Sequence, residues 1–332
     1  MNYKSLVCDC LETGHWDRAR FEAARQGDLD CVHVTLGVWE DFRETVREIT
    51  RWRRLLEENA DLATVANTVD DVVRANENNQ TAFVFGLQNT AAFEDDIELI
   101  GVLHDLGIRI AQITYNIQNL VGSGCWEPAD RGLSTTYGRG VVREMNRVGM
   151  LIDLSHVGEA TSQEAAELSE RPVSITHANP RDFVGEDVEL PFRNKSTRLV
   201  KTVCEKGGVI GLSPYPRMSR GGSDSTLKQF CEMVEWTVEL VGPQSVGIGT
   251  DLNLGNENKM AWFRKDRFAR EFAVQPKGGP TRWPDWFSSP AHFGGIAEGL
   301  RDRGFEQDVI DGVMGGNWMR LFDESFKPMD AK

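Results

Sequence analysis

The stretch LIDLSH, residues 151–156, decides the fold because it joins a short apolar run directly to polar residues. The run lacks the strict alternation of a half-exposed strand, which is typical of a parallel strand buried on both faces. We expect a strand over 150–153 that delivers Ser155 and His156 at its carboxyl end. Such a strand belongs in a parallel sheet covered by helices.

Similar apolar runs recur along the chain, separated by amphipathic segments. The eight predicted strands lie at 5–9, 31–37, 82–86, 109–114, 150–153, 172–176, 208–212 and 245–250. The predicted helices include 39–59, 94–106, 136–148, 161–169, 196–206 and 226–241. Eight alternating units favour an α/β fold closed into a (β/α)8 TIM barrel, formed as one domain by residues 1–332. No GxGxxG follows the first run, which argues against an open dinucleotide-binding sheet.

The composition limits the partners. The 332 residues carry a formal net charge of -14, so the average surface repels nucleic acid and anionic lipid. No secretory signal pattern opens the chain and no later run is long enough to span a bilayer, so we expect a cytoplasmic protein without a membrane partner. The 6 cysteines form no CxxC pair, which favours buried thiols over disulfides or a zinc finger.

Polar residues suited to catalysis follow three of the predicted strands. His156 follows the fifth strand, His177 the sixth and Asp251 the eighth. The carboxyl ends of the strands meet at one mouth of such a barrel, so these side chains are expected to lie together. Neutral imidazole is a good zinc ligand, and a nearby carboxylate can hold the metal or take a proton from its water. Any single histidine is more often structural, but two at successive strand ends favour a site.

Five motifs in a fixed order carry a resemblance to a known family. They are DLSHV at 153–157, THANPR at 176–181, Arg193-Asn194, GIGTD at 247–251 and GNW at 316–318. Together they resemble the membrane (renal) dipeptidase family, a branch of the amidohydrolase-like metal-dependent barrels. The resemblance covers most of the chain and implies hydrolysis of a dipeptide by a hydroxide held between two zinc ions.

The resemblance also implies roles for particular residues. His156 and His177 correspond to the ligands of one metal, and Asp251 to the carboxylate that binds metal and handles protons at the eighth strand. Arg193 corresponds to the clamp for the substrate carboxylate, a task that suits a planar guanidinium.

The chain departs from the family pattern at four positions. Leu11 and Thr13 stand where the family has a His-x-Asp pair, and Gln88 stands where it has the bridging glutamate. A neutral amide cannot neutralise two dications, so we expect zinc or a similar divalent metal at one ion per chain at most, or none. Tyr115 replaces a histidine expected to face the substrate, so Tyr115 and Gln88 become candidate substrate contacts.

Replacement ligands are an open alternative near the vacated position. A shifted loop would let Cys10, Glu12 or His15 supply a ligand. The simpler interpretation is that Cys10 is a buried thiol while Glu12 and His15 face solvent in the first βα loop.

The favoured function is a dipeptidase-like metallohydrolase acting on an amide bond in a small substrate with a carboxylate. The alternatives are an isomerase, tautomerase or lyase that moves protons on the same scaffold, or a non-catalytic small-molecule binder. The aromatic-rich loop at about 253–290 is expected over the barrel mouth, where it would form a lid or a homodimer contact.

Overall fold

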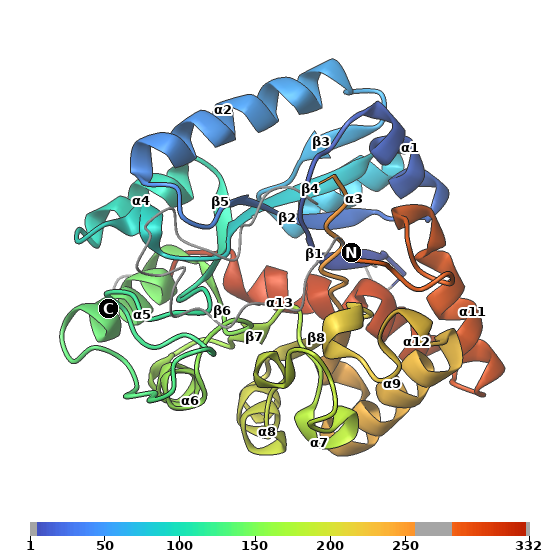
Figure 1. The fold of residues 1–332 in the computed structure, drawn as a ribbon. Helices are drawn as coiled ribbons and strands as arrows, with labels where there is room; N and C mark the ends of the chain where they lie inside the picture. Colours follow the sequence, from blue (N-terminus) through green and yellow to red (C-terminus); the bar gives the residue numbers. More distant parts are fainter. Residues whose placement is uncertain (1–4, 256–280, 330–332) are drawn as a thin grey trace.

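The computed structural model describes residues 5–255 and 281–329, and within them parallel strands form a barrel surrounded by helices (Figure 1). The strands are β1 (Cys8–Glu12), β2 (Cys31–Gly37), β3 (Ala63–Val65), β4 (Thr81–Leu87), β5 (Ile108–Gln112), β6 (Leu151–Asp153), β7 (Ser174–Ile175), β8 (Val209–Leu212) and β9 (Val246–Ile248). They pair in the order β1-β2-β4-β5-β6-β7-β8-β9, and the short β3 pairs with the first half of β4. The predicted TIM-barrel fold is therefore confirmed.

The barrel closes between its first and last strands through backbone contacts beyond β9. The Asp251 amide donates to the Leu11 carbonyl at 3.0 Å, and the Thr13 amide donates to the Leu252 carbonyl at 2.9 Å. Closure satisfies backbone groups that an open sheet would leave at its edges. It also brings the segment after β9 against the segment after β1.

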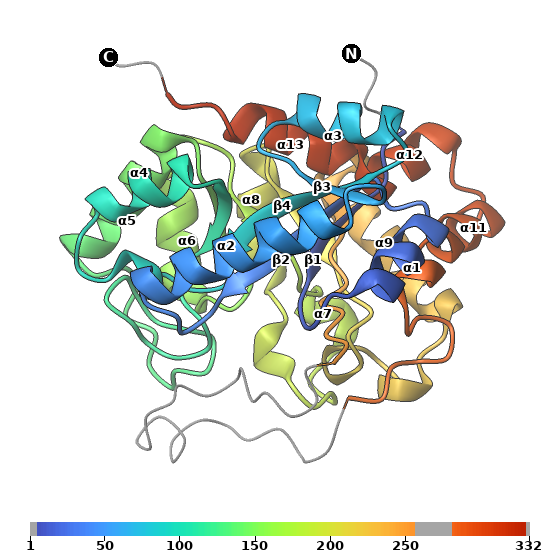
Figure 2. The ribbon, with the colours of Figure 1, turned by 90° about the horizontal axis from the view of Figure 1, so that it is seen from above.

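An outer layer of helices covers the strands (Figure 1). The helices are α1 (Arg18–Gln26), α2 (Phe42–Glu58), α3 (Val69–Glu77), α4 (Glu98–Asp105), α5 (Tyr137–Val148), α6 (Glu159–Leu168), α7 (Arg181–Val184), α8 (Thr197–Glu205), α9 (Leu227–Val241), α11 (Gly294–Asp302), α12 (Gln307–Asp311) and α13 (Asn317–Ser325). Figure 2 shows α3 and α13 along one end of the barrel. There the buried Trp318 of α13 donates its indole N–H to the Ile248 carbonyl at 3.0 Å. That end is packed shut, which leaves the opposite end for a site.

Helix α2 shows how the sequence sets one of these elements. Asp41 and Glu44 form a capping box at its start, with the Asp41 side chain accepting from the Glu44 amide at 2.8 Å. Ile49, Trp52 and Leu56 lie at three- and four-residue spacing and are buried. The remaining face of α2 is left for polar and charged side chains.

The predicted elements agree with the structure except at a few boundaries. The first strand was expected at 5–9 but is β1, Cys8–Glu12, because buried Asp9 and Glu12 find polar partners and so can lie within a buried strand. The strand β3 was not expected, since it has only 3 residues. Within the two described ranges, no helix is long and apolar enough to cross a membrane. The loop expected at 253–290 lies outside the described residues over 256–280.

Candidate active site

A cavity of about 570 Å³ opens where the carboxyl ends of the strands meet. Its lining includes five of the residues singled out by sequence, namely Gln88, Tyr115, His156, Arg193 and Asp251. They come from segments that follow β4, β5, β6, β7 and β9. The expected convergence of strand ends thus brings these five side chains to one cavity.

His177, the sixth of these residues, is fully buried behind His156. Their Nε2 atoms lie 3.0 Å apart, and Gln88 Nε2 lies 3.2 Å from the same His177 nitrogen. Burial lowers the pKa of both imidazoles well below the usual value, and the nearby Arg193 lowers it further. Both rings are therefore neutral, the form that binds a metal ion.

The other nitrogen of each ring is held by a side-chain oxygen. His156 Nδ1 lies 2.6 Å from Asn116 Oδ1, and His177 Nδ1 lies 2.7 Å from Thr176 Oγ1. Asn116 is buried and has a positive φ of 62°, a conformation that asparagine tolerates better than most residues. These contacts fix the ring planes and turn both Nε2 atoms toward each other.

A buried carboxylate sets the geometry of the two strand ends that carry the histidines. Asp153 Oδ1 accepts hydrogen bonds from the Ser155 amide at 3.0 Å and the Thr176 amide at 2.9 Å. Its Oδ2 accepts from Thr176 Oγ1 at 2.8 Å. The same threonine hydroxyl contacts His177, so Asp153 positions that ring through one intermediate.

A second carboxylate plays the same part across the barrel seam. Asp9 Oδ1 accepts from the Thr250 amide at 2.8 Å, and Asp9 Oδ2 accepts from Thr250 Oγ1 at 2.5 Å. The next residue, Asp251, has a φ of 59°, which is uncommon for a residue other than glycine. This turn carries the Asp251 side chain to the cavity that it lines.

Asp251 is an acidic group at the cavity whose pKa lies near neutrality. Burial raises its pKa, Arg193 opposes the rise and the charge on Asp153 adds to it, so that the pKa is raised to about 7 in total. A carboxyl group with this pKa can accept and return a proton at neutral pH.

Arg193 is buried, with 2% of its surface exposed, yet it lines the cavity. It donates to the Ser155 carbonyl through one terminal nitrogen and to the His177 carbonyl at 3.3 Å through the other. A guanidinium has five N–H donors, so these two contacts fix its plane and leave donors for a ligand. This arrangement suits a clamp for a carboxylate.

Tyr115 forms an aromatic wall beside the imidazole pair. Its ring stacks on His156, with centroids 4.1 Å apart and an interplanar angle of 23°, and Trp39 packs edge-on against it at 5.5 Å. Burial raises the pKa of the Tyr115 hydroxyl, so the side chain stays neutral. Tyr115 therefore forms an apolar wall that excludes water from this side of the cavity.

The structure also locates the residues around the vacated metal position. Leu11 is fully buried, and Thr13 lines the cavity. Cys10 is buried and His15 is exposed, as the simpler interpretation expected. The expectation that Glu12 faces solvent is wrong, because Glu12 is fully buried and pairs with Arg20 at 2.7 Å. That ion pair neutralises its charge and holds it away from a metal-binding role.

The donor set at the cavity fits part of the metal site that the sequence pattern implies. Two facing imidazole nitrogens 3.0 Å apart suit two ligand positions on one zinc-like ion, since Zn–N bonds are about 2.0–2.1 Å long. In residues 5–255 and 281–329, no three His, Cys, Asp or Glu side chains form a group that could hold a metal ion. The structure thus brings His156 and His177 together as predicted but does not join Asp251 to them as a third ligand. The two imidazoles thus supply two of the four ligand positions of a single zinc-like ion.

Sequence reasoning missed several residues that build the site. Asn116, Asp153 and Thr176 act through the histidines. Asp153 and Thr176 stood within motifs at the strand ends, whereas Asn116 only follows Tyr115 in the chain. Arg51 also lines the mouth, but a residue in a long helix carries no local signal of this role. His15, named from sequence only as a possible replacement ligand, lines the mouth as well.

Comparisons with known proteins agree with this geometry. The family model of membrane dipeptidases, peptidase family M19, matches residues 11–261. A crystal structure of an amidohydrolase from Pseudomonas aeruginosa is 35% identical, with a TM-score of 0.87 and coverage of 98% of this chain and 97% of that one.

Two fungal proteins are more distant curated relatives. Dipeptidase tcpJ from Claviceps purpurea is 28% identical over 298 residues, covering 89% of this chain and 62% of that protein. Dipeptidase aclJ from Aspergillus oryzae is 24% identical over 292 residues, covering 86% of this chain and 62% of that protein. The chain spans about 62% of the length of these relatives. Because the family model covers most of the chain, this protein belongs to the membrane dipeptidase family.

Proposed function

We propose that this chain is a dipeptidase-like hydrolase that cleaves an amide bond in a small substrate bearing a carboxylate. The observation that carries the proposal is that His156, Arg193 and Asp251 line one cavity of about 570 Å³. That volume lies in the range of small-molecule sites. Family membership supports the same chemistry, and so do the dipeptidase names of the fungal relatives.

Arg193 binds and orients the substrate. Its guanidinium plane is fixed by two backbone carbonyls, so its remaining N–H groups can receive a carboxylate with little loss of conformational entropy. A substrate held at this point presents its amide bond toward the imidazole pair and Asp251.

Asp251 holds and moves the proton. In its ionised form the carboxylate accepts a proton from the attacking water, and it then returns that proton to the departing amine nitrogen. The raised pKa of about 7 keeps both forms accessible at neutral pH. Tyr115 and Trp39 exclude bulk water from one side.

A divalent metal is the cofactor we propose, zinc or a similar ion, at one per chain at most. When bound, such an ion polarises the amide carbonyl and lowers the pKa of a water. His156 and His177 would hold it, with Gln88 beside them. Leu11 and Thr13 supply no imidazole or carboxylate for a second ion.

A second candidate function is proton transfer without hydrolysis. The observation that favours it is Gln88 lying 3.2 Å from His177 where the family pattern has a bridging glutamate. The same cavity with Asp251 as base would then run an isomerisation or elimination next to a carboxylate.

The test is an assay of a dipeptide panel with protein freed of metal and then supplied with zinc in steps up to two ions per chain. We expect amino acids to be released only with zinc, with full activity at one ion. His177→Ala should lower kcat/KM by about 100-fold or more, whereas the exposed His292→Ala serves as a matched control. Retained hydrolysis in His177→Ala would contradict the proposal, and a rearranged but uncleaved product would favour proton transfer.

The homodimer, the cytoplasmic location and the absence of a membrane partner stay predictions. So does a role as lid or interface for the loop at about 253–290.

A further inference from the structure

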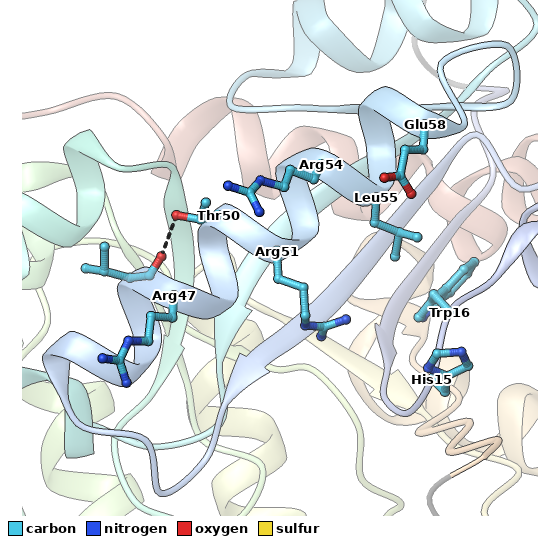
Figure 3. A pocket seen from close by; sticks show the side chains of 9 residues that line it. His15, Trp16, Arg47, Thr50, Arg51, Arg54, Leu55 and Glu58 are labelled. Carbon is cyan, nitrogen blue, oxygen red and sulfur yellow. Dashed lines mark hydrogen bonds between the residues drawn. The ribbon is translucent and has the colours of Figure 1, made fainter.

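A second groove, of about 530 Å³, lies beside the central cavity (Figure 3). One wall comes from α2 and the other from the loop after β1. His15 and Arg51 line both the groove and the cavity. A ligand leaving the cavity on this side therefore enters the groove.

Three arginines of α2 line the groove. Arg47, Arg51 and Arg54 are spaced by four and three residues, so they share one helix face and extend over about 10 Å along the axis. All three are exposed, and Figure 3 shows the Arg51 side chain extending from α2 on the side where His15 lies. The groove thus has a row of cations that starts at the cavity mouth.

Most of this positive charge is not neutralised by the protein. Arg51 pairs with Glu48 at 2.8 Å, but the Arg47 and Arg54 guanidinium groups make no ion pair or hydrogen bond within the part of the chain that the structure describes. Glu58 is the acidic residue lining the groove, and it forms no ion pair with the arginines. The groove is cationic on a chain whose net charge is -14.

The groove also offers apolar surface from both of its walls. Trp16, 2% exposed, and the half-buried Leu55 line it, and Trp16 is held by rings of the core and by Arg20 stacked over it at 4.4 Å. Apolar surface beside exposed cations suits a short aliphatic chain that ends in an anion.

We propose that this groove is a specificity subsite for a second anionic group of the substrate, a carboxylate on the residue remote from the carboxylate held by Arg193. The inference rests on the proposed function and narrows its substrate class to dianionic, dipeptide-like molecules with an acidic first residue. Arg193 fixes one end, the amide bond lies by the imidazole pair, and the acidic side chain passes Arg51 toward Arg47 and Arg54.

The expected preference is moderate because the arginines are exposed. Contacts between exposed charges contribute about 0.2–1 kcal/mol each, so Arg47 and Arg54 together should favour an anionic over a neutral first residue by roughly two- to thirtyfold. Screening shortens the Debye length from about 10 Å at 0.1 M salt to about 3 Å at 1 M. The preference should therefore shrink as salt is raised.

The experiment compares glutamyl-alanine with glutaminyl-alanine, which have the same shape and differ in one charge. Hydrolysis is measured with the zinc-loaded full chain, and binding of the same two dipeptides is measured by calorimetry on the metal-free chain. Wild type should favour glutamyl-alanine by roughly two- to thirtyfold through KM and through Kd. The double variant Arg47→Gln/Arg54→Gln should bring both ratios near one.

Arg53→Gln is the matched control, because it removes a charge from the same helix but faces the Leu106 carbonyl, to which Arg53 donates at 2.8 Å. It should keep the wild-type ratio. If the protein bound glutamyl-alanine more tightly than glutaminyl-alanine but cleaved neither, the proposed hydrolase function would be overturned and the subsite would stand. Turnover of both dipeptides at equal kcat/KM, or a preference unchanged in the double variant, would overturn the subsite. Failure of both dipeptides to bind or react would overturn both.

Discussion

Replacing Asp251 by asparagine should stabilise the metal-free protein in a pH-dependent way. The substitution keeps the shape of the side chain, and asparagine tolerates the left-handed φ of 59° at this position. What changes is the cost of holding a charge in the site. The ionised carboxylate is disfavoured by burial and by Asp153, which raises its pKa from 3.8 to about 7.

The size of the effect follows from linkage. Because the pKa is higher in the folded state, the folded protein binds more protons than the unfolded chain between about pH 4 and pH 7, so this group's stabilisation is present below pH 4 and lost as pH rises through 7. A shift of about 3 units corresponds to about 4 kcal/mol at 1.36 kcal/mol per unit. Since the carboxylate borders a cavity that water can enter, part of this energy is screened. We therefore expect the free energy of unfolding of Asp251→Asn to exceed that of wild type by about 2 to 4 kcal/mol at pH 8.5.

The assay is urea unfolding of wild type and Asp251→Asn in the presence of a chelator, at pH 4 and pH 8.5. The difference between the two proteins isolates the contribution of this carboxyl group from the other titrating groups. Asp224→Asn, at a highly exposed position, is the control and should show no such trend. The reasoning would be refuted if the two proteins were equally stable at pH 8.5. It would also be refuted if Asp251→Asn were more stable than wild type at pH 4 but not at pH 8.5.

Three further substitutions test how the site and barrel are held. Asn116→Ala removes the 2.6 Å contact to His156 Nδ1 and should lower kcat/KM by about 10- to 100-fold while circular dichroism stays unchanged; an unaltered rate would show that the ring needs no such support. Arg20→Met leaves the Glu12 carboxylate buried without its partner, so the free energy of unfolding measured in urea should fall by about 3–5 kcal/mol. Adding Glu12→Leu to the same chain should recover most of that stability, and failure to recover it would show that the unpaired carboxylate is not the cause. Gly249→Ala would place a Cβ 1.8 Å from the backbone carbonyl oxygen of Thr176, just after β7, so the melting temperature should fall by several degrees. A wild-type melting temperature would mean that these two segments pack less closely than the structure shows.

The sequence could predict two kinds of feature: strands and helices, from the spacing of apolar residues, and side chains at strand ends, which occupy a fixed place in a barrel. Apolar runs located β2 at its observed bounds and the other main strands to within a few residues. The rule that strand ends converge then placed His156 and Asp251 at one cavity, and the family resemblance added Arg193. These predictions succeed because they depend on topology and on local pattern.

The features that sequence could not predict depend on partners distant along the chain. Glu12 looked like a loop residue facing solvent, but its buried state follows from Arg20, which reaches it from α1. Asn116 follows a strand end without any sign that it will meet His156, 40 residues away. A charged residue on a long helix usually faces water, so the position of Arg51 at the cavity mouth emerges only in the folded chain.

The central claim is that the imidazole pair at the cavity holds the metal on which hydrolysis depends, one ion per chain. Anomalous diffraction at the zinc edge, from crystals of the full chain grown with excess zinc, tests it most directly. We expect one strong peak about 2.0–2.1 Å from Nε2 of both His156 and His177, and none beside Leu11 and Thr13. Two peaks in the cavity, or a single peak away from this pair, would contradict it.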